Sequence, residues 1–186
     1  MLGVSAVFGS VVLATLLRFK PTKVSLKDGE ALIRSRAMAT APGAGLKVSF
    51  QPEFVLNSLD TWETIDIRPK TCVYDIEGQL ADGSQCTLEA EFVVAVPAHE
   101  DKVLCAAGAL GVKRASSQDE IQELYRFPLV DNVQLVLARC TPEKISKETD
   151  LIRRTLLEMA PFCLERCGFE LQSADIRKLR FYKKAE

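Results

Sequence analysis

The stretch "TCVYDIEGQLADGSQCTLEAEFVVAV", residues 71–96, decides how the middle of the chain folds. Apolar and polar residues alternate on both sides of a turn, which is the pattern of two strands that each bury one face. The apolar residues of this face all carry even numbers: Cys72, Tyr74, Ile76, Leu80, Cys86, Leu88, Ala90, Phe92 and Val94. The stretch therefore predicts a β-hairpin that covers a core with one side.

The length of the hairpin loop follows from the numbering of this face. Directly opposed residues lie on the same face, so the two numbers of each pair must add to an even total. A two-residue Asp82-Gly83 turn gives odd totals and would set apolar side chains against polar ones. We therefore expect a three-residue loop over 81–83, with Gly83 in the left-handed conformation and Ile76 opposite Leu88.

Short strands are also expected before the hairpin. Residues 23–37 are typical of two strands with a turn at Asp28-Gly29, and three more short apolar runs follow within 46–68. An acidic group in this region consists of Asp60, Glu63 and Asp66. Glu63 and Asp66 fall on opposite faces of a strand, which is unsuited to acid–base work. We expect all three carboxylates to be exposed to solvent.

Helices are predicted after the hairpin. A short helix over 100–111 should stop near Gly111, and Ser117 with Glu120 forms a capping box that begins a longer helix. Pro128 predicts a kink or a new start in that helix. Its buried face is expected to consist of Ile121, Leu124, Tyr125, Val133, Val136 and Cys140.

Another helix is predicted to begin at Thr141 and Pro142, which have the residue types of a cap and a first helical position. Pro161 should bend this helix and Gly168 should end it. Its buried stripe is expected to consist of Ile145, Ile152, Leu156, Met159 and Cys163. The alternating segment 169–182 predicts a last strand. The whole order predicts an α+β fold, with an antiparallel β half followed by an α/β half.

Composition argues against several classes of function. The 186 residues, 47% of them apolar, suffice for one domain or two small ones, and 24 basic residues balance 25 acidic ones. The charge therefore gives no support for nucleic-acid binding. The six cysteines form no C-x-x-C pair, and a single histidine, His99, adds too little for a metal site. Thiols among apolar neighbours are typical of a reducing compartment.

No catalytic, cofactor-binding or metal-binding residue is predicted. The sequence has no phosphate-binding glycine loop and no G-x-S-x-G motif. A nucleophile pair of Cys105 and His99 is conceivable, but a separation of six residues does not bring two side chains together on a helix. We therefore expect a protein without enzymatic activity.

Residues 1–20 are predicted to be a membrane anchor. No charged side chain lies between Met1 and Arg18. The apolar run 2–17 would be about 24 Å long as a helix, somewhat shorter than a bilayer core of about 30 Å. A removable signal peptide is the main alternative, but no basic residue precedes the run and no small-residue cleavage site follows it. A soluble core helix is the third possibility, although the run lacks a polar face.

The predicted anchor carries two sets of candidate contact residues. Small residues spaced by four would let another membrane helix pack closely, and this ridge consists of Ser5, Ala6, Gly9, Ser10 and Ala14. Three basic residues that would lie at the lipid headgroups follow, namely Arg18, Lys20 and Lys23. Because the basic residues follow the span, the rest of the chain is expected on the cytoplasmic side, or on the matrix side of a mitochondrion.

The order of these segments resembles the SPFH, or band 7, domain of stomatins, prohibitins and flotillins, and the flotillin branch is the most similar. The resemblance covers about residues 20–181. We assign residues 1–20 to the anchor, 21–181 to the SPFH-like domain and 182–186 to a short basic tail. The motifs that carry it are "VSLKDGEALIRS" (24–35), "PGAGLKVSFQPEF" (42–54), "ETIDIRP" (63–69), "ADGSQCTLEAEFVVAV" (81–96), "LCAAGALGVKRASSQDEIQEL" (104–124), "CTPEKISKETDLI" (140–152) and "CLERCGFELQSADIRKL" (163–179).

The resemblance implies a membrane-associated scaffold that oligomerises and organises lipids or other membrane proteins, with no catalytic residue to carry over. Family members commonly assemble through a long coiled coil, and this sequence has no heptads. We therefore expect an accessory subunit of a larger membrane complex, in contact with lipid and with other membrane subunits as a homo- or hetero-oligomer. A tethered domain that binds a lipid or another apolar ligand is the alternative.

Overall fold

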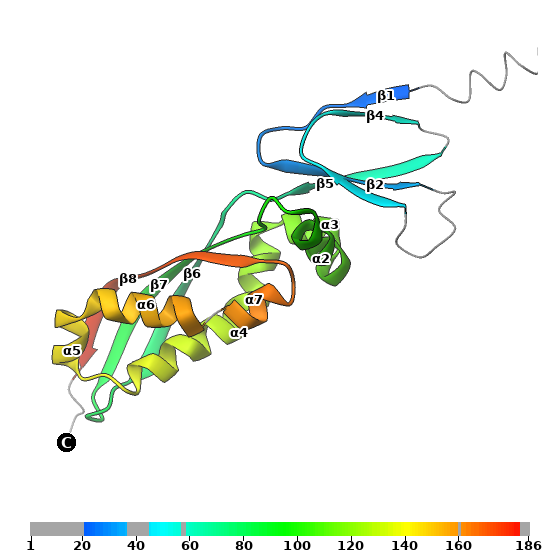
Figure 1. The fold of residues 1–186 in the computed structure, drawn as a ribbon. Helices are drawn as coiled ribbons and strands as arrows, with labels where there is room; N and C mark the ends of the chain where they lie inside the picture. Colours follow the sequence, from blue (N-terminus) through cyan, green and yellow to red (C-terminus); the bar gives the residue numbers. More distant parts are fainter. Residues whose placement is uncertain (1–20, 37–44, 57–58, 160, 183–186) are drawn as a thin grey trace, which may run out of the picture. The chain divides into compact units, whose positions relative to one another are not determined.

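The computed structural model describes residues 21–36, 45–56, 59–159 and 161–182 (Figure 1). The chain divides into two compact units, Met1–Ile65 and Asp66–Glu186, which we call the first and the second unit. The described part of the first unit is built from strands, and the second unit combines a sheet with helices. The fold is thus mixed α and β with antiparallel sheets.

The first unit contains a three-stranded sheet and a two-stranded ribbon. The sheet has the order β3-β2-β5, from β3 (Leu46–Ser49), β2 (Glu30–Arg36) and β5 (Asp60–Asp66). The ribbon pairs β1 (Pro21–Val24) with β4 (Glu53–Leu56) in antiparallel fashion. The predicted strands on both sides of Asp28-Gly29 are confirmed, but they pair with other strands and not with each other. The core of this unit is aliphatic, and one cluster of it contains Val24, Leu26, Leu32 and Val55.

The second unit is organised around the predicted hairpin. Its sheet has the order β6-β7-β8, from β6 (Lys70–Gln79), β7 (Gln85–Ala95) and β8 (Glu170–Tyr182). Ile76 lies opposite Leu88, the loop spans 81–83, and Gly83 has a φ of 81°, so the predicted register is confirmed. No side chain of the even-numbered face is more than 5% exposed.

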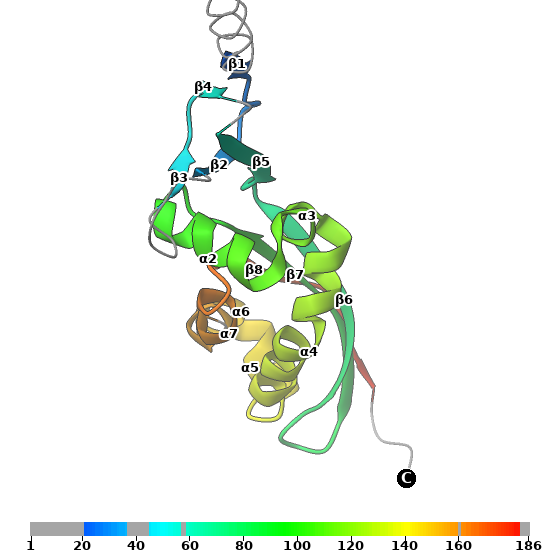
Figure 2. The same ribbon diagram turned by 90° about the vertical axis from the view of Figure 1, so that its right-hand side faces the viewer.

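Six helices of the second unit are described. They are α2 (Glu100–Leu110), α3 (Val112–Ser116), α4 (Gln118–Leu137), α5 (Pro142–Lys147), α6 (Thr149–Met159) and α7 (Pro161–Glu165). Figures 1 and 2 show α4, α6 and α7 together on one side of the β6-β7-β8 sheet. These helices cover the even-numbered, apolar face of the hairpin.

The helix ends lie where the sequence predicts them, but the continuity and the buried faces of the helices differ from the prediction in places. Ser117 accepts a hydrogen bond from the Glu120 N–H, and Gly111 ends α2 with a φ of 79°. Pro128 lies inside α4, so a new start at this residue is wrong and the helix is continuous. Leu124, expected on the buried face of α4, is 38% exposed. Leu129 and Leu137 of α4 are fully buried instead. The buried stripe of α4 is therefore rotated slightly from the predicted one.

The helix predicted from 142 to 168 is interrupted. The Thr141 side chain caps it as expected by accepting from the Lys144 N–H, and Gly168 ends it with a φ of 76°. Glu148, with a φ of −119° and a ψ of 35°, separates α5 from α6. This break turns Ile145, Ile152 and Leu156 toward the core but leaves Met159 and Cys163 half-buried.

Both edges of the second unit's sheet carry devices that disfavour further strand pairing. Side-chain amides of α4 cap the outward carbonyls of β6. Four helical residues and two strand residues advance by similar lengths of about 6–7 Å, which accounts for the spacing of the first two bonds, from Gln118 and Gln122. The three bonds are Gln118 to Thr71 O (2.5 Å), Gln122 to Val73 O (3.1 Å) and Gln134 to Glu77 O (3.0 Å). On the other edge, β8 departs from regular register with β7 at two places, and Lys178 there has a φ of 50°.

Candidate functional site: exposed aromatic side chains of the first unit

The described part of the first unit exposes all of its aromatic side chains. Phe50, Phe54 and Trp62 are 40%, 65% and 41% exposed, and the aliphatic side chain of Leu46 is 44% exposed. We call these three aromatic residues, together with Leu46, the aromatic set. Because aromatic rings bury more apolar area than other side chains, a folded chain ordinarily places them in its core first. The buried residues of this unit are aliphatic, and all of its described aromatic rings lie at the surface. This arrangement indicates a surface that contacts an apolar partner.

Two members of the aromatic set share a groove. Leu46 of β3 and Trp62 of β5 line a shallow groove of 250 Å³ on the three-stranded sheet. The central strand β2 lies between them and contributes Ile33 and Ser35 to the same groove. Leu46 pairs directly with Ser35, which fixes its side chain on this face of the sheet.

Phe54 belongs to the ribbon, where it lies directly opposite Lys23 of β1. Lys23 is exposed, so this strand pair presents an aromatic ring and an ammonium group side by side. Lys23 is also the one predicted headgroup residue that falls within the described residues. The other predicted membrane contacts lie outside them, namely Ser5, Ala6, Gly9, Ser10, Ala14, Arg18 and Lys20.

The acidic residues of this region are structural. Asp60 is only 6% exposed, so the prediction of solvent exposure is wrong for this residue. Its carboxylate accepts hydrogen bonds from the Leu56 N–H at 3.1 Å and from Arg36 Nε at 3.2 Å. The Leu56 amide, followed by the Arg36 side chain, holds the pKa of Asp60 below its usual range. Asp60 therefore closes the connection between β4 and β5 and has no proton to exchange near neutral pH.

The other two carboxylates of the acidic group also carry no paired chemistry. Glu63 is exposed, as expected, and lines the rim of the groove with Trp62. Asp66 is half-buried and forms an ion pair of 2.7 Å with Arg68, which lowers its pKa. The prediction of solvent exposure is therefore confirmed for Glu63 but not for Asp66.

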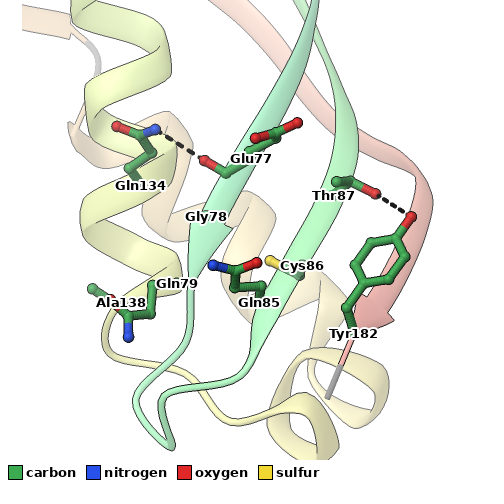
Figure 3. A pocket seen from close by; sticks show the side chains of 9 residues that line it. All are labelled: Glu77, Gly78, Gln79, Gln85, Cys86, Thr87, Gln134, Ala138 and Tyr182. Atoms are coloured by element: carbon green, nitrogen blue, oxygen red, sulfur yellow. Dashed lines mark hydrogen bonds between the residues drawn. The ribbon is translucent and has the colours of Figure 1, made fainter. Parts of the chain in front are cut away.

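A second hollow lies at the tip of the hairpin, with a volume of 620 Å³ (Figure 3). Its lining is mixed and includes the polar side chains of Gln85 and Thr87 on β7 and Gln134 on α4. Thr87 Oγ1 donates to the Tyr182 hydroxyl at 3.4 Å. Cys86 lies at its base with 1% of its surface exposed, and burial raises the pKa of this thiol. The hollow offers hydrogen-bonding groups but neither an activated nucleophile nor a proton-transfer pair.

The conceivable pair of Cys105 and His99 is not assembled as a nucleophile site. His99 is exposed at the start of α2 and its side chain makes no capping hydrogen bond. Cys105 Sγ donates instead to the Arg166 carbonyl oxygen at 3.4 Å. Within residues 21–36, 45–56, 59–159 and 161–182, no three His, Cys, Asp or Glu side chains are grouped so that they could hold a metal ion.

The exposure of the aromatic set was not predicted from the sequence. One local signal points to it: Phe54 and Val55 are adjacent on a four-residue strand, and adjacent side chains of a strand face opposite sides. One of the two must therefore face away from the core. The sequence does not say which, because that depends on how the ribbon packs on the sheet.

The predicted membrane anchor lies outside the described residues. In the part of the chain that the structure describes, no helix combines the length and the apolar character needed to cross a membrane. No protein-family model matches this sequence, and no curated protein matches it either. The resemblance to SPFH domains therefore stays a prediction.

Proposed function

We propose that this protein is a membrane-anchored scaffold, or an accessory subunit of a larger membrane complex, with no catalytic activity of its own. The arrangement proposed is SPFH-like: an N-terminal membrane helix, a β unit and an α/β unit. The observation that carries the proposal is the aromatic set, in which Phe50, Phe54 and Trp62 are exposed around an aliphatic core. We propose that these side chains rest in the interfacial layer of the membrane.

The chemistry of the aromatic set suits a lipid interface. An indole is favoured at the level of the headgroups, where its apolar body and its N–H are both satisfied, and phenyl rings gain by burial at the boundary of the acyl chains. Lys23, opposite Phe54, adds a cation that attracts anionic lipid. Full burial of such a ring contributes roughly 1.5–3 kcal/mol, so several partly exposed rings add useful affinity to a short anchor.

The hollow at the hairpin tip gives little support to the alternative of a tethered lipid-binding domain. Acyl chains require an apolar enclosure, whereas this hollow is lined by side chains such as Glu77, Gln85 and Gln134. A carboxylate and two amides favour water over a hydrocarbon chain.

Trp62 makes a direct test possible, because it is the single tryptophan of the chain. The full-length protein would be reconstituted into phosphatidylcholine vesicles with brominated acyl chains, which quench indole fluorescence by contact. We expect strong quenching of Trp62 by the brominated lipid and weak quenching by aqueous acrylamide. Full access to acrylamide together with no effect of bromine would refute the proposed contact.

A matched control moves the indole to the second unit. The double variant Trp62→Phe/Phe127→Trp places the only indole on α4, at a side chain that is 87% exposed. We expect this indole to be quenched by acrylamide and not by the brominated lipid. Native sizing after mild detergent extraction tests the scaffold itself: a lone 20.6 kDa species free of membranes would be incompatible with it.

A further inference from the structure

Three cysteines gather around a buried tyrosine in the second unit. Tyr125 of α4 is 3% exposed, and its hydroxyl has no hydrogen-bond partner of regular geometry. Burial, followed by Cys167 and then by Cys163 and Cys105, raises the pKa of this hydroxyl well above its usual range. The thiols of Cys105 on α2, Cys163 on α7 and Cys167 in the turn after α7 therefore all lie near the Tyr125 hydroxyl.

Within this group, α2 approaches the turn before β8 closely. A Cβ atom at Gly168 would lie 2.3 Å from the Lys102 carbonyl oxygen and 3.1 Å from Cys105 Cβ, so the turn fits against α2 only because residue 168 is glycine. Immediately before it, the Arg166 carbonyl oxygen accepts from Cys105 Sγ at 3.4 Å. The peptide bond that follows this carbonyl leads directly to Cys167.

Covalent geometry turns this contact into a distance between the two cysteines. A carbonyl oxygen and the next Cα are about 2.8 Å apart across a trans peptide. Cys105 Sγ therefore lies within about 6 Å of the Cys167 Cα atom. In a disulfide, the Cα–Cβ–Sγ arm of one cysteine and the S–S bond of about 2.05 Å together span the path from this Cα to the other sulfur. Rotation of the Cys167 side chain toward Cys105 closes most of the distance found here.

The other four cysteines are less suited to oxidation. Cys72, Cys86 and Cys140 are at most 5% exposed, whereas Cys105, Cys163 and Cys167 are all half-buried. Burial raises the pKa of these three thiols and also that of Cys163. A raised pKa lowers the fraction of thiolate, which is the species that reacts with disulfides.

We infer that Cys105 and Cys167 form an oxidisable dithiol that reacts with a small-molecule disulfide such as glutathione disulfide. The thiolate of one cysteine attacks a sulfur of the small disulfide, which gives a mixed disulfide and releases one thiol. The second cysteine then attacks the protein sulfur of that mixed disulfide and releases the other thiol. The protein dithiol is oxidised by two electrons, the small disulfide is reduced by two, and both protons leave on the released thiols.

The new bond would fasten α2 to the turn between α7 and β8. Everything between these residues, including α4 and α6, would be enclosed in one covalent loop. Because cross-links restrict the unfolded chain, the oxidised second unit should unfold at a higher temperature than the reduced one. Oxidation would thus stiffen the helical layer of the protein without altering the described part of the first unit.

Peptide mapping tests this inference sharply, because trypsin separates the three cysteines. Cleavage at Lys102, Lys113, Arg154, Arg166 and Arg177 places Cys105 in peptide 103–113, Cys163 in 155–166 and Cys167 in 167–177. The full-length protein would be equilibrated with mixtures of reduced and oxidised glutathione, blocked with N-ethylmaleimide, digested and analysed by mass spectrometry. We expect peptides 103–113 and 167–177 to be linked.

Single substitutions provide matched controls. Cys105→Ser and Cys167→Ser should each reduce the linked peptide more than tenfold, whereas Cys163→Ser should retain it. The unsubstituted protein is an independent test, since its linkage map does not depend on how the variants fold. A dominant link between 155–166 and 167–177, mixed disulfides that do not close, or no link until Cys72 also reacts would each overturn the inference.

Discussion

Replacing Gly168 with alanine tests the close approach of the α7–β8 turn to α2. Gly168 has a φ of 76°, which alanine adopts at a cost of roughly 1–2 kcal/mol. The added Cβ would also lie 2.3 Å from Lys102 O and 2.9 Å from Ala106 N, which are helix backbone atoms that cannot rotate away. Overpacking of this kind costs a further 1–3 kcal/mol or so. We therefore expect Gly168→Ala to lower the free energy of unfolding by about 2–5 kcal/mol.

Gly83→Ala is the matched control for the backbone cost. Gly83 has nearly the same φ, 81°, but an added Cβ there meets no atom within 4 Å. Its loss should stay near 1 kcal/mol, because alanine also restricts the unfolded chain by about 0.4–1 kcal/mol. Urea unfolding followed by circular dichroism at 222 nm reports the helical second unit. A loss for Gly168→Ala no larger than that for Gly83→Ala would refute the close approach.

Two other predictions concern charged residues. Asp60→Asn should make the stability of the first unit depend less on pH in the acid range. In the unsubstituted protein, the Leu56 amide and Arg36 hold the pKa of the Asp60 carboxyl low. The stabilisation from these contacts is complete above the usual pKa of about 3.9 and is lost as the pH falls through the pKa of the folded state. Trp62 fluorescence against pH measures this, and an unchanged profile would contradict it. The Lys178→Gly variant should be about 1 kcal/mol more stable than the Lys178→Ala variant. Both variants lose the exposed ion pair with Glu89, but only glycine adopts the φ of 50° without strain. Equal urea midpoints for the two variants would show that the bulge is unstrained.

Local rules predicted the parts of the fold that depend on neighbouring residues. The hairpin register followed from the parity of Ile76 and Leu88, and the helix ends followed from Ser117, Thr141 and Gly168. In each case the interacting groups are a few residues apart or face each other across a short loop. Their geometry is therefore contained in the sequence pattern itself.

Features decided by distant contacts were missed. The break at Glu148 lies in a segment with good helical periodicity, and the packing of α6 on the sheet overrides that pattern. Asp60 looks like a solvated acid in sequence, yet Arg36 reaches it from another strand. The candidate surface was missed for the same reason, because Phe54 and Val55 are equivalent until the ribbon has docked.

The closed edges of the β6-β7-β8 sheet matter most where many copies meet. Proteins held on a membrane move in two dimensions, and their local concentration far exceeds that of the same molecules in a cell's volume. Under such crowding, an open strand edge would let one molecule template the next into an irreversible polymer. Amide caps from α4 on one side and irregular register in β8 on the other remove that template. In the membrane assembly proposed above, neighbouring copies would therefore meet through side-chain surfaces and could separate again.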